Sequence, residues 1–184
     1  MRAVDLVERS DQDLLALAAD GDLAAFEVVV VRHFPRVHCL AIRLTDSPAE
    51  AEDIVQEVLL RLWTNAGQFN PARGRMTTWL YRITLNIALD RRRTAERNDP
   101  LAEDLPDREP DPLLRLERKQ RRAYLTSGLA GLPARQRAAV WLIYGEQMGG
   151  GQAAATLGIT TRAVEGLLRR ARLFLRARMR LGEI

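Results

Sequence analysis

The sequence has few of the features that would cross-link the chain, anchor it in a membrane or direct it out of a cell. Cys39 is the one cysteine among 184 residues, so no disulfide forms within the chain and a reducing compartment is allowed. No apolar run is long enough to span a bilayer, and the N-terminal residues contain no apolar signal core. We therefore expect a soluble, cytoplasmic protein.

The patterns that would indicate catalysis are also missing. The sequence contains no nucleophile constellation, no phosphate-binding loop and no cluster of metal ligands. His33 and His38 would point about 140° apart on a helix, whereas a helical zinc pair needs both side chains on one face. We expect no enzyme activity, no cofactor and no metal.

Aromatic residues make up only 5% of the chain, although 47% of it is apolar. The core should therefore consist mainly of Leu, Ala, Val and Ile. Helix-forming residues dominate, and no convincing strand alternation occurs. We predict an all-α protein with enough apolar material for one medium domain or two small ones.

Charge is distributed in blocks along the chain. The net charge is −7 over residues 1–60, +6 over 61–97, −4 over 98–118 and +9 over 119–184, which gives +4 for the whole chain. Surface charge without a binding role would not be expected to separate into blocks of one sign. Two basic blocks separated by an acidic one suggest two surfaces that bind a polyanion.

The composition changes sharply between Thr94 and Pro112, which contains four of the eight prolines. Such a segment cannot bury a core, so we predict an extended or disordered linker there. It divides the chain into two small helical domains, residues 1–93 and residues 113–184.

The first domain should begin with a short helix at Asp11–Asp20 and a longer helix at about Asp22–Leu44. Pro35 should kink or divide the longer helix, because proline removes a hydrogen bond from a helix interior. Ser47 is then expected to cap the next helix, with Pro48 at its first position.

That next helix, Ala49–Ala66, is acidic and amphipathic. We expect one face to pack in the core, and it consists of Ala51, Val55, Val58, Leu59, Leu62, Trp63 and Ala66. On the opposite face Leu60 lies among Asp53, Gln56 and Glu57. This face is either solvated or a partner surface with an apolar anchor inside a polar rim, and the spacing alone leaves both open.

A loop at Gly67–Arg75 and a helix at Met76–Arg93 follow. The helix is apolar round most of its circumference. Its polar stripe is narrow and consists of Arg82, Asn86 and Arg93, with Trp79 and Asp90 at the margin. The closing Arg91–Arg93 block either complements the helix dipole or binds phosphate beside aromatics that stack on unpaired bases.

The second domain should contain helices at Leu113–Leu129 and Ala134–Gln147, then a flexible joint at Gly149–Gly151. The residues after the joint have the form of a helix-turn-helix, with a turn at Gly158–Thr160 and a long helix from Thr161. We predict a buried stripe of Val164, Leu167, Leu168, Ala171, Phe174 and Leu175. The opposite face would offer side chains to base edges and phosphate, as in a recognition helix.

The residues AEDIVQEVLLRLW, an F-x-P-x-x-G loop and TWLYRITLNIALDRRR resemble the second conserved region of bacterial sigma factors, and the compact layout resembles the extracytoplasmic-function branch. The resemblance implies docking on the beta-prime clamp of RNA polymerase through Asp53, Gln56, Glu57 and Leu60. It also implies that the following loop and helix recognise and open the minus-ten promoter element. The implied contacts are Phe69, Arg73, Arg75, Trp79, Tyr81, Arg82 and Asn86.

The residues LPARQRAAVWLIYGEQ and LGITTRAVEGLLRRARLFLR resemble the fourth sigma region, which recognises the minus-thirty-five element. Gln152 stands where the family often has Glu, and Ala163–Leu167 replaces a common T-V-K/R-S-R segment, so the usual basic pair is missing. The candidate DNA contacts are Arg162, Glu165, Arg169, Arg170, Arg172 and Arg176.

We therefore predict an alternative sigma factor, a dissociable specificity subunit without catalytic chemistry. The family implies RNA polymerase core, through the beta-prime clamp and beta flap, promoter DNA and an anti-sigma factor, often membrane-anchored, as partners. It also implies control by extracellular or envelope stress. A free-standing helix-turn-helix regulator would explain the C-terminal half but not Ala49–Arg93. A helical enzyme using Asp53 and Glu57 would need a pocket that the pattern does not predict.

Overall fold

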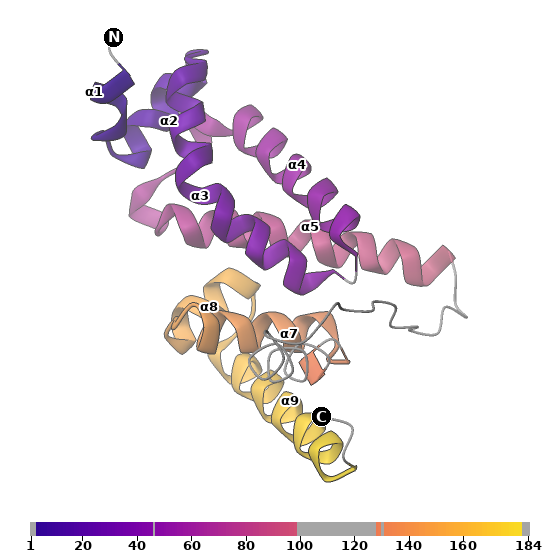
Figure 1. The fold of residues 1–184 in the computed structure, drawn as a ribbon. Coiled ribbons are helices and arrows are strands. Elements are labelled where there is room, and N and C mark those ends of the chain that lie inside the picture. The colour runs from indigo at the N-terminus through magenta and orange to yellow at the C-terminus, as the bar shows by residue number, and fades with distance from the viewer. Residues whose placement is uncertain (1–2, 46, 99–127, 130, 182–184) are drawn as a thin grey trace, which may run out of the picture.

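The computed structural model describes residues 3–45, 47–98, 128–129 and 131–181 (Figure 1). All regular elements in these ranges are helical, which confirms the predicted all-α class. Among the described helices, none is both long and apolar enough to cross a membrane.

Five α-helices form the N-terminal domain, joined between the last two by short 3₁₀ turns. They are α1 (Ala3–Val7), α2 (Asp11–Ala19), α3 (Leu23–Leu44), α4 (Pro48–Thr64) and α5 (Met76–Asn98), with η1 (Ala66–Gln68) and η2 (Pro71–Arg73) before α5. Helix α3 is central and packs against α2, α4 and α5. The buried side chains are mostly Leu, Ala, Val and Ile, as predicted.

The ends of these helices follow from capping residues in the sequence. Asp22 caps α3 by accepting a hydrogen bond from the Ala25 amide at 3.0 Å. Ser47 caps α4, and Pro48 occupies its first position, as predicted. Pro35 lies inside one continuous α3, so the alternative that it divides the helix is wrong.

The C-terminal domain consists of α7 (Ala134–Val140), the π-helical turn η3 (Trp141–Gly145), α8 (Gly150–Leu157) and α9 (Thr161–Leu181). The predicted joint at Gly149–Gly151 is wrong in part, because α8 begins at Gly150. Gly149 is its N-cap, and the Gly149 amide donates to the Gln152 side chain at 3.3 Å. The π-helical turn was not predicted.

The two domains pack against each other. Helix α5 contacts α7 and α8, helix α3 contacts α7, and one cluster of buried apolar side chains includes residues from both domains. At this junction the Arg43 guanidinium lies 3.8 Å from the ring centre of Trp141. Figure 1 shows α7 and α8 below α3 and α5, with α9 leading away from them.

Helix α5 is longer than the predicted helix Met76–Arg93. Helix α5 continues past Arg93 to Asn98, so the first residues of the predicted linker are helical. The rest of that linker, 99–112, and the predicted helix Leu113–Leu129, except for its last two residues, lie outside the described residues.

Candidate nucleic-acid and partner interfaces

The acidic face of α4, defined as Asp53, Gln56, Glu57 and Leu60, points away from the core. Leu60 is 63% exposed, Asp53 and Gln56 are exposed, and Glu57 is half-buried. The other side of α4 is packed as the periodicity predicted, with the addition of the fully buried Ile54. The exposed Leu60 is therefore an apolar side chain surrounded by polar ones.

Arginines fix the two carboxylates of this face. The Arg61 guanidinium binds Glu57 Oε1 within α4. Arg91 of α5 contacts Glu57 Oε2 at 3.2 Å and Asp53 Oδ2 at 3.4 Å. The sequence pattern places Arg91 in a terminal basic block and gives no sign of this contact, because its partners lie more than thirty residues away.

The loop between α4 and α5 has a defined conformation. Asn70 accepts a hydrogen bond from the Ala72 amide at 2.9 Å, which starts the second 3₁₀ turn. Gly74 ends that turn at φ +140°, where residues with a side chain are strained. The rings of Phe69 and Trp79 then pack with centroids 5.7 Å apart and planes at 42°.

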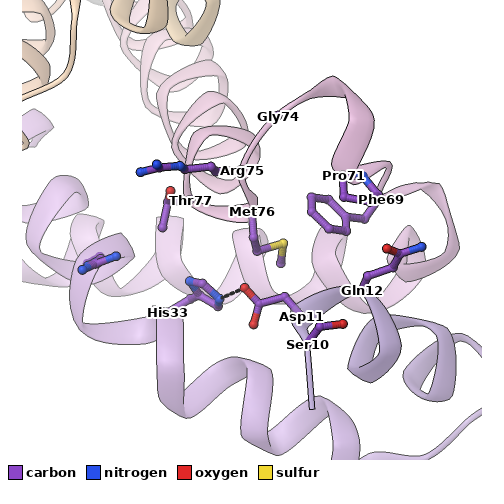
Figure 2. Close-up of a pocket in the computed structure, with 11 residues that line it drawn as sticks. Ser10, Asp11, Gln12, His33, Phe69, Pro71, Gly74, Arg75, Met76 and Thr77 are labelled. Carbon is purple, nitrogen blue, oxygen red and sulfur yellow. Dashed lines mark hydrogen bonds and ion pairs between the residues drawn. The ribbon is translucent and has the colours of Figure 1, made fainter. Parts of the chain in front are cut away.

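This loop borders a hollow of about 600 Å³ that also touches the start of α2 and the middle of α3. His33 Nε2 bonds to Asp11 Oδ2 at 2.9 Å, while the buried Nδ1 has no partner among the described residues. Figure 2 shows this pair in the hollow, with Phe69 and Arg75 of the loop nearby. From the sequence we consider His33 only as a metal ligand and reject that role, and the pattern gives no sign of its place here.

The predicted minus-ten contacts differ in accessibility. Arg75, Arg82 and Asn86 are exposed, whereas Phe69 and Trp79 are half-buried. Arg73 lies in η2, and its side chain lies outside the described part of the structure. Tyr81 is 0% exposed in this arrangement.

Tyr81 faces the C-terminal domain. Its hydroxyl has no hydrogen bond of good geometry among the described residues, so Glu146 acts on it as a neighbouring charge. Burial and this carboxylate raise the pKa of Tyr81 above its ordinary value. In the packed arrangement Tyr81 is therefore inaccessible to a partner molecule.

The C-terminal domain presents a helix-turn-helix at α8 and α9. Gly158 makes the turn at φ +65°, and Thr160 caps α9 through the Ala163 amide at 3.2 Å. The predicted buried stripe is confirmed, with Val164, Leu167 and Ala171 buried and its other members half-buried. All six candidate DNA contacts are exposed, namely Arg162, Glu165, Arg169, Arg170, Arg172 and Arg176.

Comparison with known proteins identifies both domains. The Sigma-70 region 2 model matches residues 29–98, and the Sigma-70 region 4 model matches residues 122–175. The ECF RNA polymerase sigma factor SigE of Mycolicibacterium smegmatis is 35% identical over 182 residues, which cover 94% of this chain and 70% of SigE. The chain belongs to the ECF sigma factors.

Further relatives support this assignment. The ECF sigma factor SigM of Mycobacterium tuberculosis is 33% identical over 168 residues, 90% of this chain and 82% of SigM. Among solved structures, CnrH of Cupriavidus metallidurans, in complex with the cytosolic domain of CnrY, has a TM-score of 0.65 and 29% identity. The match covers 93% of this ECF sigma factor and 97% of the CnrH chain.

Proposed function

We propose that this ECF sigma factor docks on core RNA polymerase through the acidic face of α4. The exposed Leu60 carries this proposal, because an apolar side chain ringed by Asp53, Gln56 and Glu57 has the composition of an interface anchor with a polar rim. The carboxylates would meet a basic partner surface, which favours rapid and oriented association. In the family this partner is the beta-prime clamp.

The loop and α5 would bind the minus-ten element after it opens. The hollow beside Phe69 and Arg75 has room for an unstacked base, and the exposed Arg75 and Arg82 would hold the backbone. Trp79 adds an aromatic face at the same end of α5. Melting would be favoured because these groups bind unpaired bases better than a duplex.

The exposed face of α9 would recognise the minus-thirty-five element. Arg162 and Arg169 are suited to bidentate contact with guanine, and Glu165 between them could accept a hydrogen bond from cytosine. Arg172 and Arg176 lie further along α9 and would contact phosphate. The C-terminal domain would also meet the beta flap.

An anti-sigma factor is the expected regulator, and its release in response to an extracellular or envelope stress would activate transcription. The similar protein CnrH was solved in complex with the cytosolic domain of CnrY, which supports a partner of this kind. We place the active protein in the cytoplasm, with RNA polymerase supplying all catalysis.

Run-off transcription with core polymerase and a library of genomic promoters tests the proposed function. The wild-type chain should direct initiation at a subset of promoters that share minus-ten and minus-thirty-five sequences. An Asp53→Asn/Glu57→Gln variant should lose this activity in proportion to lost polymerase affinity. Promoter-independent initiation would contradict the function, and full activity of the variant would contradict the proposed docking face.

A further inference from the structure

Arg91 connects two helices at the acidic face of α4. Its side chain extends from α5, with Nη1 3.4 Å from Asp53 Oδ2 and Nη2 3.2 Å from Glu57 Oε2. It is 36% exposed, so most of it is covered. Arg91 therefore holds two of the four residues that the proposed function assigns to polymerase docking.

The two carboxylates need such a cation to stay in one arrangement. Asp53 and Glu57 are four residues apart on α4, where like charges repel each other. Arg61 occupies Glu57 Oε1 and leaves Oε2 to Arg91, so both oxygens of Glu57 have fixed partners. The planar fork of a guanidinium can contact both carboxylates at once, which a lysine ammonium does poorly.

We propose that Arg91 is a positioning residue for polymerase docking, which holds the Asp53 and Glu57 carboxylates in their docking arrangement before the polymerase arrives. This inference rests on the proposed role of the acidic face. Ordering the carboxylates in advance reduces the entropy lost on association. Asp53 Oδ1, which Arg91 leaves uncontacted, stays available to the partner.

A direct role in DNA binding is the competing explanation, because Arg91 begins the basic block Arg91–Arg93. The contacts oppose it, since Arg91 points toward two carboxylates that offset its charge. A guanidinium neutralised in this way attracts phosphate less than an exposed one. If Arg91 positions the carboxylates, its substitution changes the affinity for polymerase. If Arg91 binds DNA, its substitution changes the affinity for DNA.

The test is a double-mutant cycle on affinity for core polymerase, measured by fluorescence titration of the full chain. Arg91→Ala should weaken binding roughly three- to tenfold, the range for two partly exposed ion pairs. In an Asp53→Asn/Glu57→Gln background the same substitution should have almost no effect, because its partners are gone. Arg91→Lys should restore only part of the affinity.

Three controls separate positioning from effects on charge, DNA binding and folding. Arg93→Ala removes the same charge two residues further along α5, where Arg93 pairs with Asp90 of its own helix at 3.7 Å, and should leave polymerase affinity unchanged. At saturating sigma factor, the Arg91→Ala holoenzyme should bind minus-ten single-stranded DNA as the wild type does. Thermal unfolding by circular dichroism confirms that each variant is folded; if Arg91→Ala unfolds, Arg91→Lys replaces it in the cycle.

The possible results separate a failure of the positioning role of Arg91 from a failure of the proposed docking face. An equal loss in both backgrounds, a gain in polymerase affinity, or a loss confined to DNA binding would overturn the positioning role of Arg91. If Asp53→Asn/Glu57→Gln leaves polymerase affinity unchanged, the proposed docking face is wrong. If that variant binds weakly but Arg91→Ala does not, only the role of Arg91 fails.

Discussion

Leu60 and Leu62 are two residues apart on α4 but occupy opposite environments, with 63% and 1% of their surfaces exposed. Replacing Leu60 by Asp should leave the unfolding temperature almost unchanged, because no core contact is lost. Polymerase affinity should fall by about 2 kcal/mol or more, as expected of an apolar hot spot. Circular dichroism and a polymerase binding titration measure the two effects.

Leu62→Asp is the matched control for this prediction. It places a carboxylate in the core of the N-terminal domain, so it should unfold the domain outright. If Leu60→Asp unfolds the protein to the same extent, Leu60 has a structural role and the docking surface must be sought elsewhere.

Gly166 lies inside α9, where glycine lowers helix stability because its unfolded chain is more flexible. Within the part of the chain that the structure describes, a Cβ at this position would meet only the Arg170 guanidinium, at 3.6 Å, which is an ordinary contact. Gly166→Ala should therefore raise the free energy of unfolding by about 0.5 to 1 kcal/mol. A urea titration of the free protein measures it, and a lower midpoint would show that the methyl group clashes.

At the scale of the element, α9 should divide its arginines between base recognition and phosphate binding. Arg169→Ala should weaken promoter binding by about 1 to 3 kcal/mol and relax preference at one or two minus-thirty-five positions. Arg176→Ala should instead weaken all promoters alike and reduce the salt dependence of binding. Promoter selection with the holoenzyme of each variant compares the two effects.

Unchanged base preference in the Arg169→Ala variant would remove this residue from the recognition surface. A relaxed preference in the Arg176→Ala variant would shift base recognition further along α9. Both residues are exposed in the free protein, so neither substitution should change stability by more than about 0.5 kcal/mol.

The sequence predicted the features that depend on residues close together in the chain. The 3.6-residue period located the buried faces of α4 and α9, and the Ser47-Pro48 pair located the start of α4. It could not predict the ion pairs of Arg91 or the burial of Tyr81, because each depends on residues distant in the chain. The contact of His33 with Asp11 is a further example.

At the scale of the whole molecule, the packed arrangement of the two domains limits access to α5. The cation–π contact of Arg43 with Trp141 contributes to this packing by about 0.5 to 2 kcal/mol. Arg43→Ala should therefore increase the population with separated domains and expose Tyr81. We expect the free chain to bind minus-ten single-stranded DNA about two- to fivefold more tightly, measured by fluorescence anisotropy.

An increase in DNA affinity separates opening of the domains from the simple loss of a positive charge. Loss of an arginine by itself weakens binding to a polyanion, so tighter binding requires the domains to open. Arg43→Lys keeps a cation over the indole ring and should behave nearly as the wild type does. Weaker DNA binding by Arg43→Ala would show that the junction does not control access to α5.

The π-helical turn η3 determines where Glu146 lies at this junction. The Glu146 amide donates to the Trp141 carbonyl at 3.0 Å, across one residue more than an α-helical turn contains. Each residue of a helix turns its successors by about 100°, so without the extra residue the segment from Glu146 onward would leave the helix in another direction. The junction with Tyr81 is therefore specified by residue count as well as by residue type. Within this sigma factor, a one-residue deletion in Trp141–Gly145 should alter the contact between the domains more than most single substitutions there.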